Sequence, residues 1–362
     1  HPQPGATHHS AQIGRHMLKW EQHTEFVTYT VYSDGVSARA FDPADYSVFP
    51  EDWLEDAPGE RITSLLMRLE ERPEEAVMER SLSNWFVPES MAASAVLDHN
   101  AVVASDFRID PAGHVRFAVF VAPGTGERRV GRIVQRLCEI ETYKAMSMLG
   151  FSRARKLNAD LGALDAKLTR MMAQMTGGEA PAEHTLTQLL TISAQLEAMG
   201  AESSFRFGAT GAYEALVNQR IGLLREERLG AYQTFGDFMI RRYEPAMRTV
   251  KSAETRLVSL ADRARRAGEL LRTRVDVERS AMTQALLESM DRRADLQLRL
   301  QHTVEGLSVV AISYYAVSLT GYVLYPFAKA FDLSKGNLIA MITLPVVAAV
   351  WYGVRRVRER LH

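Results

Sequence analysis

Histidines near the start of the chain are the first residues whose chemistry could serve a function, because imidazole rings bind metals and transfer protons. Five of the ten histidines fall within the first 23 residues: His1, His8, His9, His16 and His23. Most of them lie in a polar segment that has no helical i, i+4 pair to make ligands converge, which favours a mobile, solvated N-terminus. His23 and Glu25 stand two residues apart at the start of a predicted strand and share one face. That pair leaves a catalytic or metal-binding role open.

Two further positions could carry chemistry. The loop Gly124-Thr125-Gly126 precedes a predicted helix, and helix N-termini can bind anions. It lacks the lysine of a P-loop and the spacing of a dinucleotide fingerprint, so a plain start of a helix is favoured. Cys138 lies in the helical stretch RLCEIE without a histidine partner, which indicates a packed thiol.

Composition and missing motifs exclude several classes of protein. The net charge of −1 argues against a general nucleic-acid binder. The single cysteine excludes an internal disulfide and any CxxC site. Nucleophile elbows, HExxH motifs and kinase motifs are absent from the sequence. We therefore expect no enzyme, no cofactor and no metal site.

A stripe of hydroxyl-bearing residues runs along an apolar segment near the C-terminus, at intervals of three, four or seven residues. Its members are Ser308, Tyr315, Ser318, Tyr322 and Tyr325. In a membrane such a stripe should avoid lipid and face another helix or water. Helix packing within an oligomer and the lining of a pore are both open. The segment has no charged residue in its interior, which argues against a proton-coupled transporter.

The stripe belongs to the first of two long stretches that lack charge. Residues 306–328 number 23, and residues 336–354 number 19. As helices they would measure roughly 35 Å and 28 Å, against a hydrocarbon core of about 30 Å. The sequence therefore predicts a hairpin of two transmembrane helices, with the lipid bilayer as its partner.

Basic residues predict how the hairpin is oriented. They flank both outer ends: Arg292, Arg293 and Arg299 before the first span, and Arg355, Arg356, Arg358 and Arg360 after the second. The connection from Lys329 to Lys335 carries two lysines and one aspartate. The positive-inside rule then places the body and the basic tail, residues 355–362, in the cytoplasm and the short connection outside.

The part before the spans divides by its prolines, nine of which fall at or before Pro123. Residues 1–123 are predicted to form a small α/β domain. Residues 17–20 and 25–32 read as paired strands, and residues 102–109 and 114–121 as a hairpin. Residues 61–71 and 74–85 have helical spacing.

Residues 124–305 are predicted to form a long helical region. Helices are expected from Glu127 towards Met175, over 185–199, over 213–243, and from near Pro245 into the first span. A heptad seam in the last helix includes Leu257, Ala264, Leu271, Val275, Met282, Ala285 and Leu296. It could pack on the chain's other helices or join subunits. The predicted fold class is α+β, mostly α, with a small α/β domain, a helical stalk and the hairpin.

Several stretches resemble a bacterial family of membrane-anchored proteins that contain domain of unknown function 3422. They are residues 20–32, 131–151, 205–221 and 270–322, and the segment from Met290 to Tyr315 is distinctive. The resemblance implies anchoring in the bacterial inner membrane and a further N-terminal segment before His1. It implies no activity or catalytic residue.

The arrangement of the chain is also similar to magnesium channels of the CorA type, although their Gly-Met-Asn motif is replaced here by Gly321-Tyr322-Val323. The leading interpretation is an oligomeric, membrane-anchored scaffold that recruits protein partners. An ion channel or transporter is the alternative.

Overall fold

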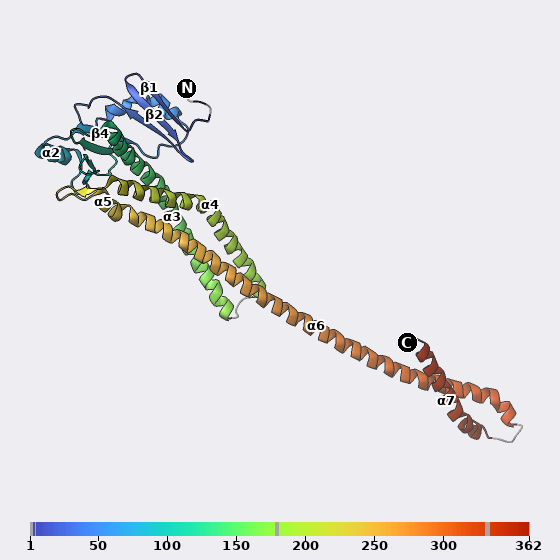
Figure 1. The fold of residues 1–362 in the computed structure, drawn as a ribbon. Coiled ribbons are helices and arrows are strands. Elements are labelled where there is room, and N and C mark those ends of the chain that lie inside the picture. Colours follow the sequence, from blue (N-terminus) through green and yellow to red (C-terminus); the bar gives the residue numbers. More distant parts are fainter. Residues whose placement is uncertain (1–2, 4, 178–180, 330–333, 362) are drawn as a thin grey trace. The chain divides into compact units, whose positions relative to one another are not determined.

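The computed structural model describes residues 3, 5–177, 181–329 and 334–361 (Figure 1). The chain divides into two compact units, residues 1–271 and residues 272–362. The fold is α+β and mostly helical, as predicted. The domain boundaries expected at residues 123 and 305 stay predictions.

The first unit opens with a three-stranded antiparallel meander made of β1 (His8–Ile13), β2 (His16–Gln22) and β3 (Val27–Tyr32). The pairing of β2 with β3 confirms the predicted strand pair. The expectation of a mobile N-terminus was wrong for His8, His9 and His16, which lie on strands. Backbone hydrogen bonds to β2 hold β1 in place, so its polar side chains do not prevent strand formation. His1 lies outside the described residues.

A second sheet has the strand order β4-β7-β6-β5-β8. The strands are β4 (Leu65–Glu71), β5 (Ala92–Val96), β6 (Ala101–Ser105), β7 (Val115–Val121) and β8 (Glu227–Arg228). The antiparallel pair β6–β7 confirms the predicted hairpin. The predicted helix over residues 61–71 was wrong, because residues 65–71 form β4, parallel to β7. Six of the seven β4 residues are partly buried, so the apolar/polar alternation that marks a strand is missing.

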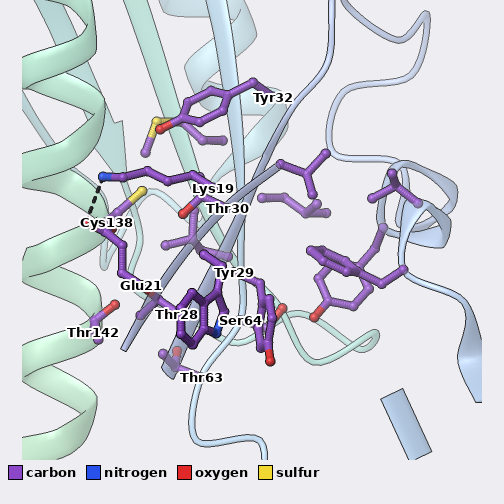
Figure 2. A pocket seen from close by; sticks show the side chains of 18 of the residues that line it. Lys19, Glu21, Thr28, Tyr29, Thr30, Tyr32, Thr63, Ser64, Cys138 and Thr142 are labelled. Carbon is purple, nitrogen blue, oxygen red and sulfur yellow. Dashed lines mark ion pairs between the residues drawn. The ribbon is translucent and has the colours of Figure 1, made fainter. Parts of the chain in front are cut away.

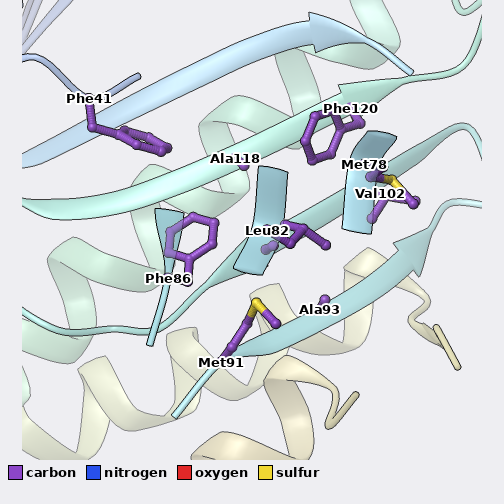
Figure 3. Close-up of a cluster of buried hydrophobic side chains, with 10 residues drawn as sticks. Phe41, Met78, Leu82, Phe86, Met91, Ala93, Val102, Ala118 and Phe120 are labelled. Carbon is purple, nitrogen blue, oxygen red and sulfur yellow. The ribbon is translucent and has the colours of Figure 1, made fainter. Parts of the chain in front are cut away.

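Helices cover both faces of this second sheet. On one face, α2 (Glu75–Trp85) places Met78 and Leu82 in a cluster with Val102 and Phe120 (Figure 3). On the other face, Phe117 of β7 packs against Phe235 of α5 (Phe235–Arg242), with the ring centroids 6.1 Å apart. The connection from β3 to β4 contains the short helices η1 (Pro43–Val48) and α1 (Glu51–Asp56).

Three long helices make up the rest of the first unit: α3 (Glu127–Gly177), α4 (Ala182–Leu224) and the first part of α6 (Glu244–Lys329). The starts predicted near residues 127 and 245 are confirmed. The separate helices predicted over 185–199 and 213–243 were wrong, because α4 runs unbroken through Gly200, Gly208 and Gly211. A glycine inside a helix costs only about 1 kcal/mol, which tertiary packing offsets. Helix α4 ends instead at Leu224, and the next residue, Arg225, adopts the left-handed conformation that caps it.

The three helices pack through close contacts. A Cβ atom at Gly150 of α3 would overlap the side chain of Thr210 of α4. Arg263 of α6 forms an ion pair with Asp165 of α3 at 2.7 Å. Along the predicted heptad seam Leu257, Ala264 and Leu271 are buried. Up to residue 271 the seam therefore packs within the chain.

The second unit holds the rest of α6 and α7 (Lys335–Leu361). Both predicted spans lie in these helices. Pro326 and Pro345 are helical, which a span tolerates. The connecting residues 330–333 lie outside the described part of the chain.

Candidate functional site

The helices of the second unit expose their large apolar side chains. Leu319 and Val323 of α6 are exposed, and Leu344 of α7 is 79% exposed. Within the described residues, two helices are long and apolar enough to cross a membrane. In water such a surface is unfavourable by about 25 cal/mol for each Å² of apolar area. The surface is therefore chemically suited to contact with lipid.

Where α6 meets α7, small residues allow a close approach. Ser313 is 6% exposed, and a Cβ atom at Gly321 would lie 3.6 Å from Ile339 of α7. Thr320 Oγ1 donates to the Ala316 carbonyl at 2.7 Å, which satisfies its hydroxyl within the helix. Small residues of this kind are typical of helix packing in membranes.

The predicted hydroxyl stripe is not part of this contact. Tyr315 and Tyr322 are 67% and 71% exposed, and Ser308 and Tyr325 are also exposed, while Ser318 is partly buried. At one end of the stripe, the Lys335 ammonium lies 5.4 Å from the Tyr322 ring centroid and 5.9 Å from that of Tyr325. The stripe is thus free to face a second protein surface or water. Its role stays a prediction.

The predicted basic flanks lie at the ends of the two helices. Arg292 and Arg293 are exposed on α6, and Arg299 pairs with Asp295 at 3.1 Å. On α7 Arg355 and Arg356 are exposed, and the Arg355 guanidinium lies 5.4 Å from the Trp351 ring centroid. The side chains of Arg358 and Arg360 lie outside the described part of the structure. The orientation derived from these residues stays a prediction.

The pair His23 and Glu25 belongs to a contact between the meander and the helices. Glu25 accepts hydrogen bonds from Arg206 at 2.7 Å and 3.1 Å and from the Tyr213 hydroxyl at 2.7 Å. Burial alone would raise the pKa of Glu25, but the hydrogen bonds from Arg206 and Tyr213 lower it below its usual value. The His23 ring stacks on Phe26, with centroids 4.3 Å apart. The Glu25 contacts fasten the meander to α4, and the His23 ring also lies edge-on to Tyr143 of α3 at 6.5 Å, so both side chains have structural contacts.

A buried hydroxyl–imidazole pair was not predicted. Ser64 Oγ and His114 Nδ1 lie 2.5 Å apart at the starts of the parallel strands β4 and β7. Burial lowers the pKa of His114 below its usual value, because it outweighs the opposing effect of the Asp110 carboxylate, and the Arg61 guanidinium adds to the lowering. The two residues are 50 positions apart, so no local spacing in the sequence could have revealed the pair.

A cavity of about 2270 Å³ lies between the meander, β4 and α3 (Figure 2). Lys19 and Glu21 form an ion pair at 2.9 Å on its wall, near Cys138. Burial raises the pKa of Cys138 to about 12, so this thiol is not a nucleophile at neutral pH. In the described ranges no group of three His, Cys, Asp or Glu residues could hold a metal ion.

The loop Gly124-Thr125-Gly126 leads into α3 at Glu127. Gly124 has a φ of +81°, and the Thr125 hydroxyl donates to the Asn100 carbonyl at 3.1 Å. The glycine therefore serves a turn, and the threonine is used by the protein itself. This agrees with the favoured interpretation of a plain helix start.

Fold and surfaces define a mostly helical α+β protein with two helices able to cross a membrane. Among known families, the one described as "Protein of unknown function (DUF3422)" matches residues 1–361. The chain therefore belongs to this family, which confirms the resemblance to proteins with domain of unknown function 3422. No curated protein matched the chain.

Proposed function

We propose that this protein is a membrane-anchored scaffold, whose α6–α7 hairpin lies in the bilayer and whose body faces the cytoplasm. The observation that carries the proposal is the exposed apolar surface of both helices, centred on residues such as Leu319 and Leu344. A soluble protein would bury such residues, whereas a lipid environment favours their exposure. The hairpin supplies the anchor and residues 1–271 supply the body that partners would bind.

The orientation follows from the charged ends of the hairpin. Arginines lie before the first span and after the second, and both groups favour the cytoplasmic side. With two spans, the body and the basic tail then share one compartment. In a bacterial cell this membrane would be the inner membrane.

A scaffold is favoured over an enzyme because the polar clusters of the body already have internal partners. Glu25 is held by Arg206 and Tyr213, and Ser64 lies against His114. An ion channel is the second candidate, and the exposed hydroxyl stripe with Tyr315 and Tyr322 supports it. The absence of a Gly-Met-Asn motif disfavours magnesium selectivity of the known kind.

Extraction and topology test the proposal together. After an alkaline carbonate wash of cell membranes, the intact chain should stay in the membrane pellet. A reporter that is active only in the cytoplasm should be active when it is fused after His362. Release of the chain into the supernatant would overturn the anchor, and a reporter active only outside the cytoplasm would overturn the orientation.

A further inference from the structure

One stretch of α6 in the second unit exposes all of its large apolar side chains. Every side chain from 276 to 304 is exposed, although this stretch contains many large apolar residues. They include Met282, Leu286, Met290, Leu296, Leu300 and Val304. An isolated helix with such a surface is unfavourable in water. Something must therefore cover part of it.

Helix geometry aligns part of this apolar surface with the hydroxyl stripe. At about 3.6 residues per turn, positions 18 apart have the same direction around a helix. Met282, Leu300 and Ser318 are spaced in this way, as are Leu286, Val304 and Tyr322. Each member of the second set follows a member of the first by four residues, so all six share one face of α6. We name this face, from Met282 to Tyr322, the α6 stripe.

The α6 stripe changes character along its length. In the part before Gly306, which the proposed function places in water, this face is mainly apolar, with Ser289 and Arg293 among its residues. In the part that the proposed function places in lipid, the face carries the hydroxyl groups of Ser318 and Tyr322 beside the apolar Leu307 and Ala311. Apolar side chains exposed to water and hydroxyl groups exposed to lipid are both unfavourable. A protein surface that follows the helix through both environments would satisfy the two parts together.

Helix α7 covers little of the α6 stripe: its first residue, Lys335, approaches the Tyr322 ring at 5.4 Å. Ser313 and Thr320, which are buried or partly buried in the hairpin, lie about 200° to 220° around α6 from Met282. The stripe tyrosines Tyr315 and Tyr322 stay exposed. The hairpin contact is thus centred on another side of α6 than the α6 stripe, although Gly321 lies about 60° from Ser318 and Lys335 of α7 lies over the Tyr322 ring.

We propose that the α6 stripe is covered by the same stripe of a second copy of this chain, in parallel and in register. This inference rests on the proposed function. Copies anchored in one bilayer have the same orientation and height, so apolar residues of one copy meet apolar residues of the next, and hydroxyls meet hydroxyls. A different partner would need the same change from apolar to polar at the same depth. Parallel helices with an apolar seam are the known solution for such a surface.

Arg293 is a charged residue within the α6 stripe, and its replacement tests whether the stripe is an interface. It stands midway in the row Leu286, Arg293 and Leu300, whose members are seven residues apart. In a parallel, in-register pair the two Arg293 side chains approach each other, which disfavours association. Arg293→Leu should therefore strengthen self-association, by about tenfold in the association constant. On a face turned to solvent the same substitution would change nothing.

Crosslinking of single cysteines in cell membranes tests the α6 stripe, in the full chain with Cys138→Ser. Leu300→Cys and Leu298→Cys form a matched pair, because both leucines are exposed, at 67% and 57%, but point about 200° apart. Tyr322→Cys and Val323→Cys form a second pair inside the span. We expect dimer formation at positions 300 and 322 and little at positions 298 and 323. Arg293→Leu should increase the yield at position 300.

The outcomes separate this inference from the proposed function. Equal crosslinking at stripe and control positions, or none at any position, would overturn the stripe as an interface. If the chain also fails to stay in carbonate-washed membranes, the anchor fails with it. A chain that stays in the membrane without stripe-specific crosslinks defeats the inference alone. Crosslinks of the stripe cysteines only to a different protein would replace the second copy by that partner.

Discussion

The two units, residues 1–271 and residues 272–362, differ in the kind of side chain that they bury and the kind that they expose. The first unit buries polar groups and satisfies them internally, as in the contact of Glu25 with Arg206 and Tyr213. The second unit exposes apolar groups such as Leu319 and Leu344 and leaves them without cover in the described chain. The difference teaches that the first unit satisfies its own buried polar groups, whereas the second presents an apolar surface that the proposed bilayer and a proposed second helix would cover. Each prediction below perturbs one side of this comparison.

The largest effect is expected from a charge in the second span. Leu344→Arg places a guanidinium where an exposed leucine would face lipid, which costs about 3 kcal/mol near the centre of a span. The variant should lose most of its insertion, measured as the fraction of chain left in carbonate-washed membranes. Leu270→Arg is the matched control, since Leu270 is an exposed leucine of the first unit. Equal behaviour of the two variants would show that both leucines face water.

The contact of Glu25 is expected to be the most costly polar contact to break in the first unit. Glu25→Gln removes the carboxylate that Arg206 and Tyr213 hold, and should lower the stability of the first unit by about 2 kcal/mol. Thermal unfolding of the detergent-solubilised chain, followed by tryptophan fluorescence, measures the change. Glu89→Gln, at an exposed loop position, should stay within about 0.5 kcal/mol. If Glu25→Gln left the stability of the first unit unchanged, the meander would be held by its aromatic contacts alone.

A smaller loss is expected where α3 approaches α4. A Cβ atom at Gly150 would overlap Thr210, so Gly150→Ala should destabilise the first unit by about 1–3 kcal/mol, as overpacking usually does. Gly162 lies on the same helix, where an added Cβ atom would have no neighbour within 4 Å. Gly162→Ala should raise stability by up to about 1 kcal/mol, from helix propensity. Opposite signs in the same unfolding assay identify Gly150 as a packing contact, whereas two stabilised variants would contradict it.

The smallest effect is expected from acidification. The pKa of His114 and the pKa of Glu25 are both lowered in the folded protein. A lowered pKa contributes stability above the unfolded value, and this contribution is lost as pH falls. His114 should therefore cost stability below about pH 6.5, and Glu25 below about pH 4.5. His114→Asn should make the unfolding midpoint depend less on pH between pH 7 and pH 5. An unchanged dependence would rule out His114 as its cause.

The two units also differ in how far their sequence predicts them. The two long apolar helices were predictable because their stretches without charge are long enough to be read directly from the sequence. The meander pair and the β6–β7 hairpin were predictable from strand-forming residues and a turn. Strand β4 was missed because it is partly buried on both faces, and the continuity of α4 because its glycines resemble breaks. The partners of Glu25 lie 181 and 188 positions away, so the fold alone brings them together.

In the candidate site, too, some features were predictable from the sequence and others were not. The positions of the stripe residues followed from spacing along one helix, since α6 is continuous through residues 308–325. Their exposure did not follow, because it depends on the side of α6 that α7 covers. Ser64 and His114 come from different strands, and only the parallel pairing of β4 with β7 brings them together.

Labelling of a single cysteine at Ser334 tests most directly whether the second unit lies in lipid. Ser334 is exposed and precedes α7, on the side of the hairpin that the arginine flanks do not share. In the Cys138→Ser background, Ser334→Cys should react with a membrane-impermeant thiol reagent in spheroplasts, before lysis. A cysteine at Glu55, an exposed residue of the first unit, should react only after lysis. Reaction of Ser334→Cys only after lysis would contradict the account.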